Sequence, residues 1–245
     1  MDKWKTRYPH LAAGLARTVD IVAKLREQPD AELEARFGII NERGRFESGV
    51  TRNEIDRIID MMQASPHVIG DEEWREEQDF FFTLNGNQYR TRVSYNSETM
   101  QVNAHTIEKK KIDTQTLRIV RPDGTPHTTD VRVSLKSEAP VLRLQPCVTT
   151  DMVRIKQRRR FTTLCGNWAF DFSIIWSGRD KTAAEVAQST KDPMFEVECE
   201  LIDSKKLLAT HTDDRIACSL LLKMYDLISH EECTLQTLIA NDTSA

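Results

Sequence analysis

Residues 195–201 read FEVECEL, a run in which glutamate alternates with apolar residues. Consecutive side chains of a β-strand point to opposite faces of the sheet, so Glu196, Glu198 and Glu200 share one face. The apolar residues share the other face, which must be buried. A row of like charges on one face repels itself. Such a row persists where cations or a bound ion compensate it, which favours an enclosed, charged space beside this strand.

A second strand-like run, 153–161 (VRIKQRRRF), carries a row of the opposite sign. The basic residues on one of its faces are Arg154, Lys156, Arg158 and Arg160. For either strand alone, a solvent-exposed face is the simpler interpretation, but such faces usually mix signs. Carboxylate rows can hold a hard divalent cation, and basic rows can hold phosphate oxygens. Together they are the components of metal-assisted phosphoryl transfer.

The sequence around these rows predicts a mainly β (α+β) fold. Period-two runs extend from about residue 80 to 201, with turn signals at 85–86, 122–124 and 166–167. The residues 31–40 form a further strand-like run. We expect the remaining strands at 79–84, 88–95, 100–109, 113–120, 128–137, 151–163, 167–176 and 194–202. Many short strands with few helices favour an antiparallel barrel, and inward-facing charges would make its interior a polar tunnel.

Three segments place apolar residues at helical spacing: 9–26, 51–63 and 213–229. In the second, Thr51 and Glu54 have the spacing of a capping box. Helices packed outside the barrel would cover the apolar faces of the strands. Because no repeat or linker is visible, we expect a single domain. Its expected parts are an N-terminal helix in 1–28, a barrel core in 29–205 and a C-terminal helix in 206–245.

The composition limits the class of function. The 245 residues carry a net charge of −4, whereas a protein that coats a nucleic-acid backbone is usually basic. Phosphate-binding charge must therefore be concentrated locally, which suits a pocket for one polyanionic group. The five cysteines lack zinc-site spacing, and neither a signal peptide nor a membrane span is visible. We expect an intracellular protein of the nucleus or cytoplasm, or of a viral factory if the chain is viral, with reduced thiols and no membrane association.

Three stretches together resemble a known family. They are 32–38 (ELEARFG), 44–50 (GRFESGV) and the triple-glutamate run 195–201. They are similar to motifs of the triphosphate tunnel metalloenzymes, in the RNA 5′-triphosphatase branch of fungal, protozoan and viral mRNA capping. The resemblance covers roughly residues 30 to 201. It implies an antiparallel β-barrel tunnel with flanking helices, and a divalent-cation-dependent hydrolase that removes the γ-phosphate of triphosphate-ended RNA as the first step of capping.

The resemblance also implies roles for single residues. Glu32, Glu34 and Glu200 would bind Mg²⁺ or Mn²⁺, for which oxygen ligands are suited. Glu138 would position or deprotonate the attacking water. The catalytic clamp on the γ-phosphate would comprise Arg92, Lys156 and Arg158. Further substrate-binding residues, of which the acidic ones would hold basic groups in place, would be Arg90, Lys109, Lys111, Arg154, Arg160, Asp171, Ser173, Glu196 and Glu198.

The expected partner is the 5′-triphosphate end of RNA. An RNA guanylyltransferase is a second implied partner, because no guanylyltransferase lysine motif is visible here. An apolar side of a terminal helix could form a homodimer. Two alternatives stay open at this point. One is an inorganic tripolyphosphatase or nucleoside triphosphatase on the same scaffold. The other is a non-catalytic barrel that binds polyphosphate or RNA ends, against which the carboxylate rows argue because they repel phosphate.

Overall fold

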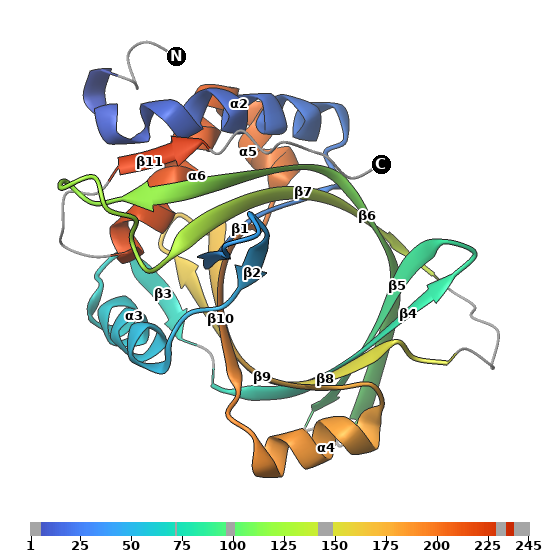
Figure 1. Cartoon of the computed structure of the whole chain (residues 1–245). Coiled ribbons are helices and arrows are strands. Elements are labelled where there is room, and N and C mark those ends of the chain that lie inside the picture. The colour runs from blue at the N-terminus through green and yellow to red at the C-terminus, as the bar shows by residue number, and fades with distance from the viewer. Residues whose placement is uncertain (1–5, 72, 97–100, 142–148, 229–233, 238–245) are drawn as a thin grey trace.

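The computed structural model describes the chain except residues 1–5, 72, 97–100, 142–148, 229–233 and 238–245. Its strands form one sheet that closes into a barrel (Figure 1). Strand β1 closes the ring because it pairs with both β10 and β7, and all pairings are antiparallel. Around the ring the strands are β1 (Glu32–Ile40), β10 (Met194–Leu201), β9 (Trp168–Gly178), β8 (Met152–Thr163), β4 (Arg75–Leu84), β5 (Asn87–Asn96), β6 (Gln101–Val120) and β7 (Asp130–Pro140). The predicted antiparallel barrel is confirmed.

Three short strands extend the sheet beyond the ring. They are β2 (Phe46–Ser48) on β1, β3 (Val68–Asp71) on β8 and β11 (Thr234–Thr237) on β6. The prediction of two separate strands at 100–109 and 113–120 was wrong, because both belong to the single strand β6; Met100 itself lies outside the described residues. The pairing register of β6 shifts between Lys111 and Asp113. This shift reverses which residues face outward, so the sequence pattern is interrupted although the strand continues.

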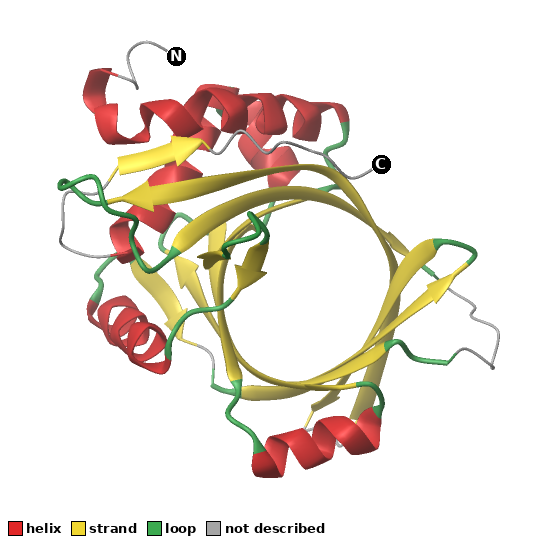
Figure 2. Cartoon of the chain, viewed as in Figure 1, coloured by secondary structure: helices red, strands yellow, loops and turns green. Residues whose placement is uncertain are grey.

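Helices lie outside the barrel (Figure 2). The predicted ones are η1 (Pro9–Leu11) with α2 (Ala12–Glu27), then α3 (Arg52–Ala64) and α6 (Asp213–Ile228). The capping box is confirmed, since the Glu54 N–H donates to Thr51 Oγ1 and the Thr51 N–H donates to Glu54. Helices α4 (Lys181–Thr190) and α5 (Ser204–Thr210) were not predicted. Asp180 and Asp203 are their N-caps, and these caps were the missed signal.

The apolar core lies between the outer barrel surface and the helices. Leu33, Ala35 and Phe37 of β1 point outward into it, where they join apolar residues of α2 and α6. Because side chains alternate along a strand, the glutamates between them point into the lumen. The charged interior that the sequence predicts follows from this alternation.

Two further observations concern membrane association and thiols. None of the helices in the described part of the chain combines the length and apolarity that crossing a bilayer requires. Three cysteines are free thiols, of which Cys165 is exposed while Cys199 and Cys218 are buried. The other two, Cys147 and Cys233, lie outside the described residues.

Candidate active site in the barrel lumen

The lumen has a carboxylate wall that faces a basic wall. On one side β1 and β10 pair so that Glu34 lies opposite Glu200 and Arg36 opposite Glu198. In the ring of strands β4 is farthest from β1, so it forms the opposite side, and it is flanked by β8 and β5. The basic row of β8 and the arginines of β5 therefore lie across the lumen from the glutamates of β1 and β10. Figure 1 shows the positions of these strands around the ring.

Buried acidic residues hold the cations of the basic wall. Asp79 of β4 is fully buried, and it accepts hydrogen bonds from Arg92 Nε at 2.8 Å and Nη2 at 3.0 Å. The Lys156 ammonium lies 3.3 Å from the same carboxylate. Burial alone would raise the pKa of Asp79, but Arg92 and Lys156 outweigh it and hold that pKa well below its usual range. Asp79 is therefore a permanent anion between two of the predicted phosphate-binding residues.

A second buried acid, Asp171 of β9, orients two more cations. Arg158 Nη2 lies 2.5 Å from it, and Arg160 donates to both of its oxygens at 2.8 and 2.6 Å. These contacts outweigh burial and lower the pKa of Asp171. Arg160 also reaches Glu200 at 2.7 Å, so it connects the basic wall to the carboxylate wall. Ser173, one inward position further along β9, is buried and lies between Arg158 and Glu196 in register.

Cations are interleaved with the glutamates of the carboxylate wall as well. Arg36 Nη2 lies 2.6 Å from Glu34 and 2.9 Å from Glu198, and Lys136 of β7 also contacts Glu34. Burial would raise the pKa of Glu198, but Arg36 and the nearby lysines lower it below its ordinary value. On the same strand, Glu196 lies 3.6 Å from Arg154 Nη1.

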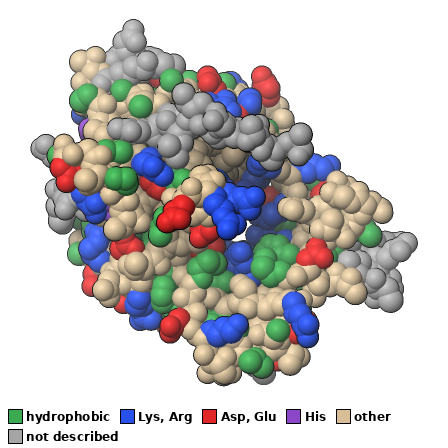
Figure 3. All heavy atoms as spheres, viewed as in Figure 1, with side chains coloured by type: hydrophobic (Ala, Val, Ile, Leu, Met, Phe, Trp, Pro, Cys, Tyr) green, Lys and Arg blue, Asp and Glu red, His purple; other side chains and the backbone are tan. Residues whose placement is uncertain are grey.

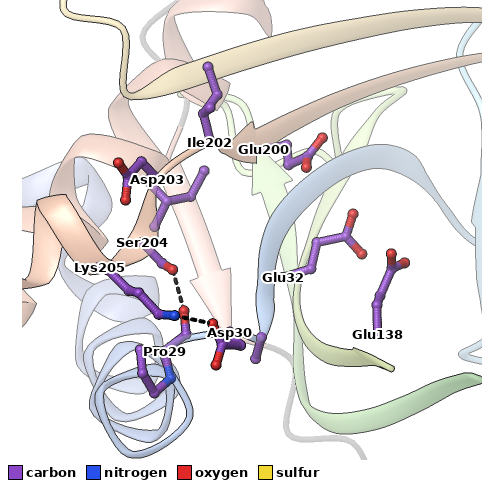
Figure 4. Close-up of a pocket in the computed structure, with 11 residues that line it drawn as sticks. Pro29, Asp30, Glu32, Glu138, Glu200, Ile202, Asp203, Ser204 and Lys205 are labelled. Carbon is purple, nitrogen blue, oxygen red and sulfur yellow. Dashed lines mark hydrogen bonds and ion pairs between the residues drawn. The ribbon is translucent and has the colours of Figure 1, made fainter. Parts of the chain in front are cut away.

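The carboxylate mouth, defined by Glu32, Glu138 and Glu200, is one end of the lumen. It lines a pocket of about 340 Å³ whose outer part is formed by residues 29–31 and 201–205. Glu32 and Glu138 point toward one another there (Figure 4). Burial and the charges of neighbouring carboxylates, first of all Glu34, raise the pKa of Glu32 to about 8. Burial also raises the pKa of Glu200.

Glu138 differs from its neighbours at the carboxylate mouth. Lys109 contacts its carboxylate, and Arg90 Nη2 lies 3.6 Å away. Burial would raise the pKa of Glu138, but Lys109 and Arg90 together lower it. Two carboxyls that face one another thus have opposite protonation tendencies, with Glu138 ionised and Glu32 inclined to keep a proton. Such separation of neighbouring pKa values is typical of acid–base sites.

The residues at this mouth suit a hard divalent cation in their chemistry. Among the described residues no three acidic side chains already surround one point at metal-ligand distance, since Glu34 contacts Arg36 and Lys136 instead. The donors are nevertheless all carboxylate oxygens. Glu32 Oε2 is buried and accepts no hydrogen bond from any described residue. Burial and then the neighbouring carboxylates raise the pKa of Glu32, and a bound cation would favour its ionised form.

The structure brings the predicted site residues together. All of them occupy inward-facing positions of their strands, as the registers of Glu32 with Lys136, Lys109 with Glu138 and Arg158 with Ser173 show. Lys111 is exposed at an inward position, whereas Lys110 faces outward toward Glu108. The inward-facing charged residues that the sequence did not assign to the site include Arg36, Glu77, Asp79, Arg132 and Lys136. The signal for Glu77 and Asp79 was their alternation within β4.

A family model matches most of the chain. The model of the family described as mRNA capping enzyme, beta chain (mRNA_triPase) matches residues 39–217, more than half of the chain. The matched range includes Glu138, Lys156 and Glu200 but begins after Glu32 and Glu34. The closed barrel places Glu34 beside Glu200 all the same. No curated protein sequence matches the chain significantly.

Solved structures share the fold at low sequence identity. The RNA triphosphatase Pct1 of S. pombe superposes with a TM-score of 0.61 at 17% identity, over 87% of this chain and 91% of Pct1. Pct1 in complex with the Spt5 CTD gives 0.62 at 18% identity, over 87% and 92%. The Mimivirus capping enzyme triphosphatase gives 0.57 at 14% identity, over 87% and 97%. With the family match and the lumen geometry, the chain belongs to the mRNA capping enzyme beta chain family, the mRNA triphosphatases, and is an RNA 5′-triphosphatase.

Proposed function

We propose that the lumen holds the terminal phosphates of RNA between its two walls, with Arg92, Lys156 and Arg158 on the γ-phosphate. The observation that carries this proposal is that three cations from two strands converge around the buried anions Asp79 and Asp171. Cations fixed in this way need no reorganisation as charge moves onto the β-phosphate during bond breaking. Their ion pairs lie in an enclosed site, where electrostatic stabilisation is stronger than in water.

Glu138 is the proposed base or orienting group for the attacking water. Its lowered pKa keeps it ionised near neutral pH, so it can accept a hydrogen bond or proton from water. Lys109 and Arg90 hold its carboxylate within the carboxylate mouth. Attack by this water on the γ-phosphorus would break the bond to the β-phosphate bridging oxygen, and the products would be inorganic phosphate and diphosphate-ended RNA.

Glu32, Glu34 and Glu200 are the proposed ligands of Mg²⁺ or Mn²⁺. A bound divalent cation would polarise the γ-phosphate oxygens and offset their charge next to the carboxylates. In the structure Glu34 and Glu200 contact Arg36 and Arg160, so these arginines are placed to exchange their carboxylate partners for phosphate oxygens. Either metal suits this set of carboxylate oxygens.

The remaining lumen residues have supporting roles in this proposal. Lys109, Lys111, Arg90, Arg154 and Arg160 would contact further phosphate oxygens. Glu196, Glu198, Asp171 and Ser173 would hold those basic groups in orientation, and the ion pairs of the first three with arginines support this.

An RNA guanylyltransferase that accepts diphosphate-ended RNA would be the partner of the next step, and the expected compartment is the nucleus or cytoplasm. We also propose a homodimer formed through an apolar side of a terminal helix.

The test is phosphate release from RNA labelled at its γ-phosphate, with and without Mg²⁺ or Mn²⁺. Parallel reactions with tripolyphosphate and ATP rank the substrates. We expect metal-dependent release from RNA that falls on the order of 100-fold in Glu32→Ala, equivalent to about 3 kcal/mol of transition-state stabilisation. The matched control is Glu76→Ala, which removes an exposed glutamate from β4. If the folded protein with metal releases phosphate from none of the substrates, the barrel is a binding module and the proposal is wrong.

A further inference from the structure

The β2 mouth is the end of the lumen opposite the carboxylate mouth, beside β2 and α4, and it faces the viewer in Figures 1 and 3. Two arginines there lie over aromatic rings. Arg132 Cζ is 4.4 Å from the ring centroid of Phe46, and Arg154 Cζ is 5.4 Å from that of Phe81. Figure 3 shows basic and hydrophobic side chains gathered around the opening. The β2 mouth therefore combines positive charge with aromatic surface, whereas the other end carries Glu32, Glu138 and Glu200 beside Lys109.

A glycine allows Phe46 to reach this position. Gly38 occupies an inward position of β1, two residues after Arg36. A Cβ atom at Gly38 would lie 2.5 Å from Phe46 Cζ and 2.3 Å from the Glu47 carbonyl oxygen. The Phe46 ring thus covers the lumen side of Gly38, and any larger residue at this position would displace it. Arg132, on the neighbouring strand β7, lies against this ring.

Within the part of the chain that the structure describes, the charge of Arg132 has no acidic partner. Its Nε donates to Thr116 Oγ1 at 3.1 Å, and none of the described carboxylates forms an ion pair with it. It lies beside Arg36 in register. Burial and the charge of Arg36 lower the pKa of Arg132. Arg92 and Arg158 are paired with buried acids, whereas Arg132 has no carboxylate partner among the described residues.

We propose that Arg132, which lies over the Phe46 ring, binds the RNA chain beyond its triphosphate, and that RNA enters through the β2 mouth. This inference rests on the proposed function. Guanidinium planes stack on unpaired bases, and their N–H groups donate to phosphate. Tripolyphosphate has neither a base nor a phosphodiester, so Arg132 would distinguish RNA from it. The arginines and aromatic rings of the β2 mouth would attract a polyanion that carries unstacked bases.

The experiment compares Arg132→Ala with the parent protein on triphosphate-ended RNA and on tripolyphosphate. We expect kcat/KM for RNA to fall about tenfold, mainly through KM, with less than about a twofold change for tripolyphosphate, since a lost charge-assisted contact has about that effect. Loss of one phosphate contact should also make the dependence of log(kcat/KM) on log salt shallower by about 0.7 for RNA. Arg132→Lys should recover only part of the loss, because lysine lacks the planar group.

The control is Arg179→Ala, which removes an exposed arginine next to α4 at the same end of the barrel. It should leave both substrates unchanged. A parallel measurement of the Kd for triphosphate-ended RNA, by fluorescence anisotropy without metal, tests the contact independently of turnover, and Arg132→Ala should weaken it about tenfold. Equal losses on RNA and tripolyphosphate, or an unchanged Kd, would overturn the role of Arg132 while leaving the proposed function intact. Absence of turnover with an Arg132-dependent Kd would instead contradict the proposed function.

Discussion

Single residues in the lumen are kept charged by their partners and not by solvent. Asp79 has no exposed surface, yet Arg92 and Lys156 hold it as an anion. Because both cations are themselves half-buried or buried, each depends on the carboxylate as the carboxylate depends on them. Removing one member of such a group leaves uncompensated charge in a poorly solvated place, which costs more than the group contributes when complete.

The substitution Asp79→Asn tests this dependence. It should lower the free energy of unfolding by about 3 kcal/mol at neutral pH, because Arg92 loses its bidentate partner and Lys156 its counter-charge. Urea denaturation measures the change. Asp56→Asn is the control, since Asp56 forms an exposed ion pair with Arg52 and should contribute less than about 1 kcal/mol. Similar changes in the two variants would show that the lumen ion pairs are screened like surface ones.

Glu32 gives the metal-free protein a pH dependence of defined sign. Its pKa is raised from 4.5 to about 8, so between these values the folded protein keeps a proton that the unfolded chain releases. The stability of the folded state therefore falls as pH rises through this range. In EDTA, Glu32→Gln should raise Tm relative to the parent at pH 8, and the difference should disappear near pH 4.5. The control Glu76→Gln should show no such pH dependence, and a Tm difference equal at both pH values would contradict the assignment.

At the scale of elements, the contact between β1 and β2 forms the rim of the β2 mouth. Gly38 pairs with Ser48, and the chain between the two strands returns so that the Phe46 ring lies over the glycine. The space for a side chain at this position is occupied partly by backbone, because the Glu47 carbonyl lies where a Cβ would be. Unlike the end of a flexible side chain, this group moves only if the two strands separate.

Gly38→Ala should therefore lower the free energy of unfolding by about 2 kcal/mol, as overpacking at a rigid site does. It should also reduce turnover of RNA more than that of tripolyphosphate, because Phe46 and Arg132 are displaced together. The comparison is Gly14→Ala in α2, where the nearest atoms belong to the Leu117 side chain, which can move. Thermal unfolding and phosphate release measure the two effects. A Gly38→Ala protein as stable as the parent would show that β2 is only loosely attached.

The lumen at the centre of the molecule is polar, and the apolar core lies outside the barrel, under the helices. Most small domains instead have an apolar centre. Neighbouring residues of one strand consequently belong to different environments. Phe172 of β9 is fully buried under the helices and packs edge-on against Phe161 with centroids 5.4 Å apart. Asp171 and Ser173 on either side of it face the lumen. Stability and chemistry are therefore separated across the thickness of the sheet.

This separation predicts opposite results for one substitution in the outer apolar layer and one in the lumen. Phe172→Ala should lower the free energy of unfolding by about 3–5 kcal/mol through the cavity it creates, with turnover per folded molecule nearly retained. Glu200→Ala should lose about 100-fold in turnover while Tm changes by only a few degrees. Calorimetry and active-site-normalised phosphate release measure both. Loss of turnover and Tm together in Glu200→Ala would mean that this carboxylate is structural.

The sequence by itself determined which residues share a face, because strand periodicity follows from local backbone geometry. The rows on β1, β8 and β10, the capping box at Thr51 and the outer helices were all visible in it. It did not show α4, α5 or the continuity of β6, because short helices and a register shift leave weak periodic signals. The division of the chain at residues 28 and 205 stays a prediction.

Only the tertiary structure decided which rows face one another and which charges pair. Glu34 lies beside Glu200, and Asp79 lies between Arg92 and Lys156, because the barrel closes with a particular register. Arg132 was overlooked because its strand has no single-sign row. Only the structure shows that it lies over Phe46 and that no described carboxylate pairs with it. The physical reason is that alternation depends on neighbouring residues, whereas register and closure depend on contacts between strands far apart in the chain.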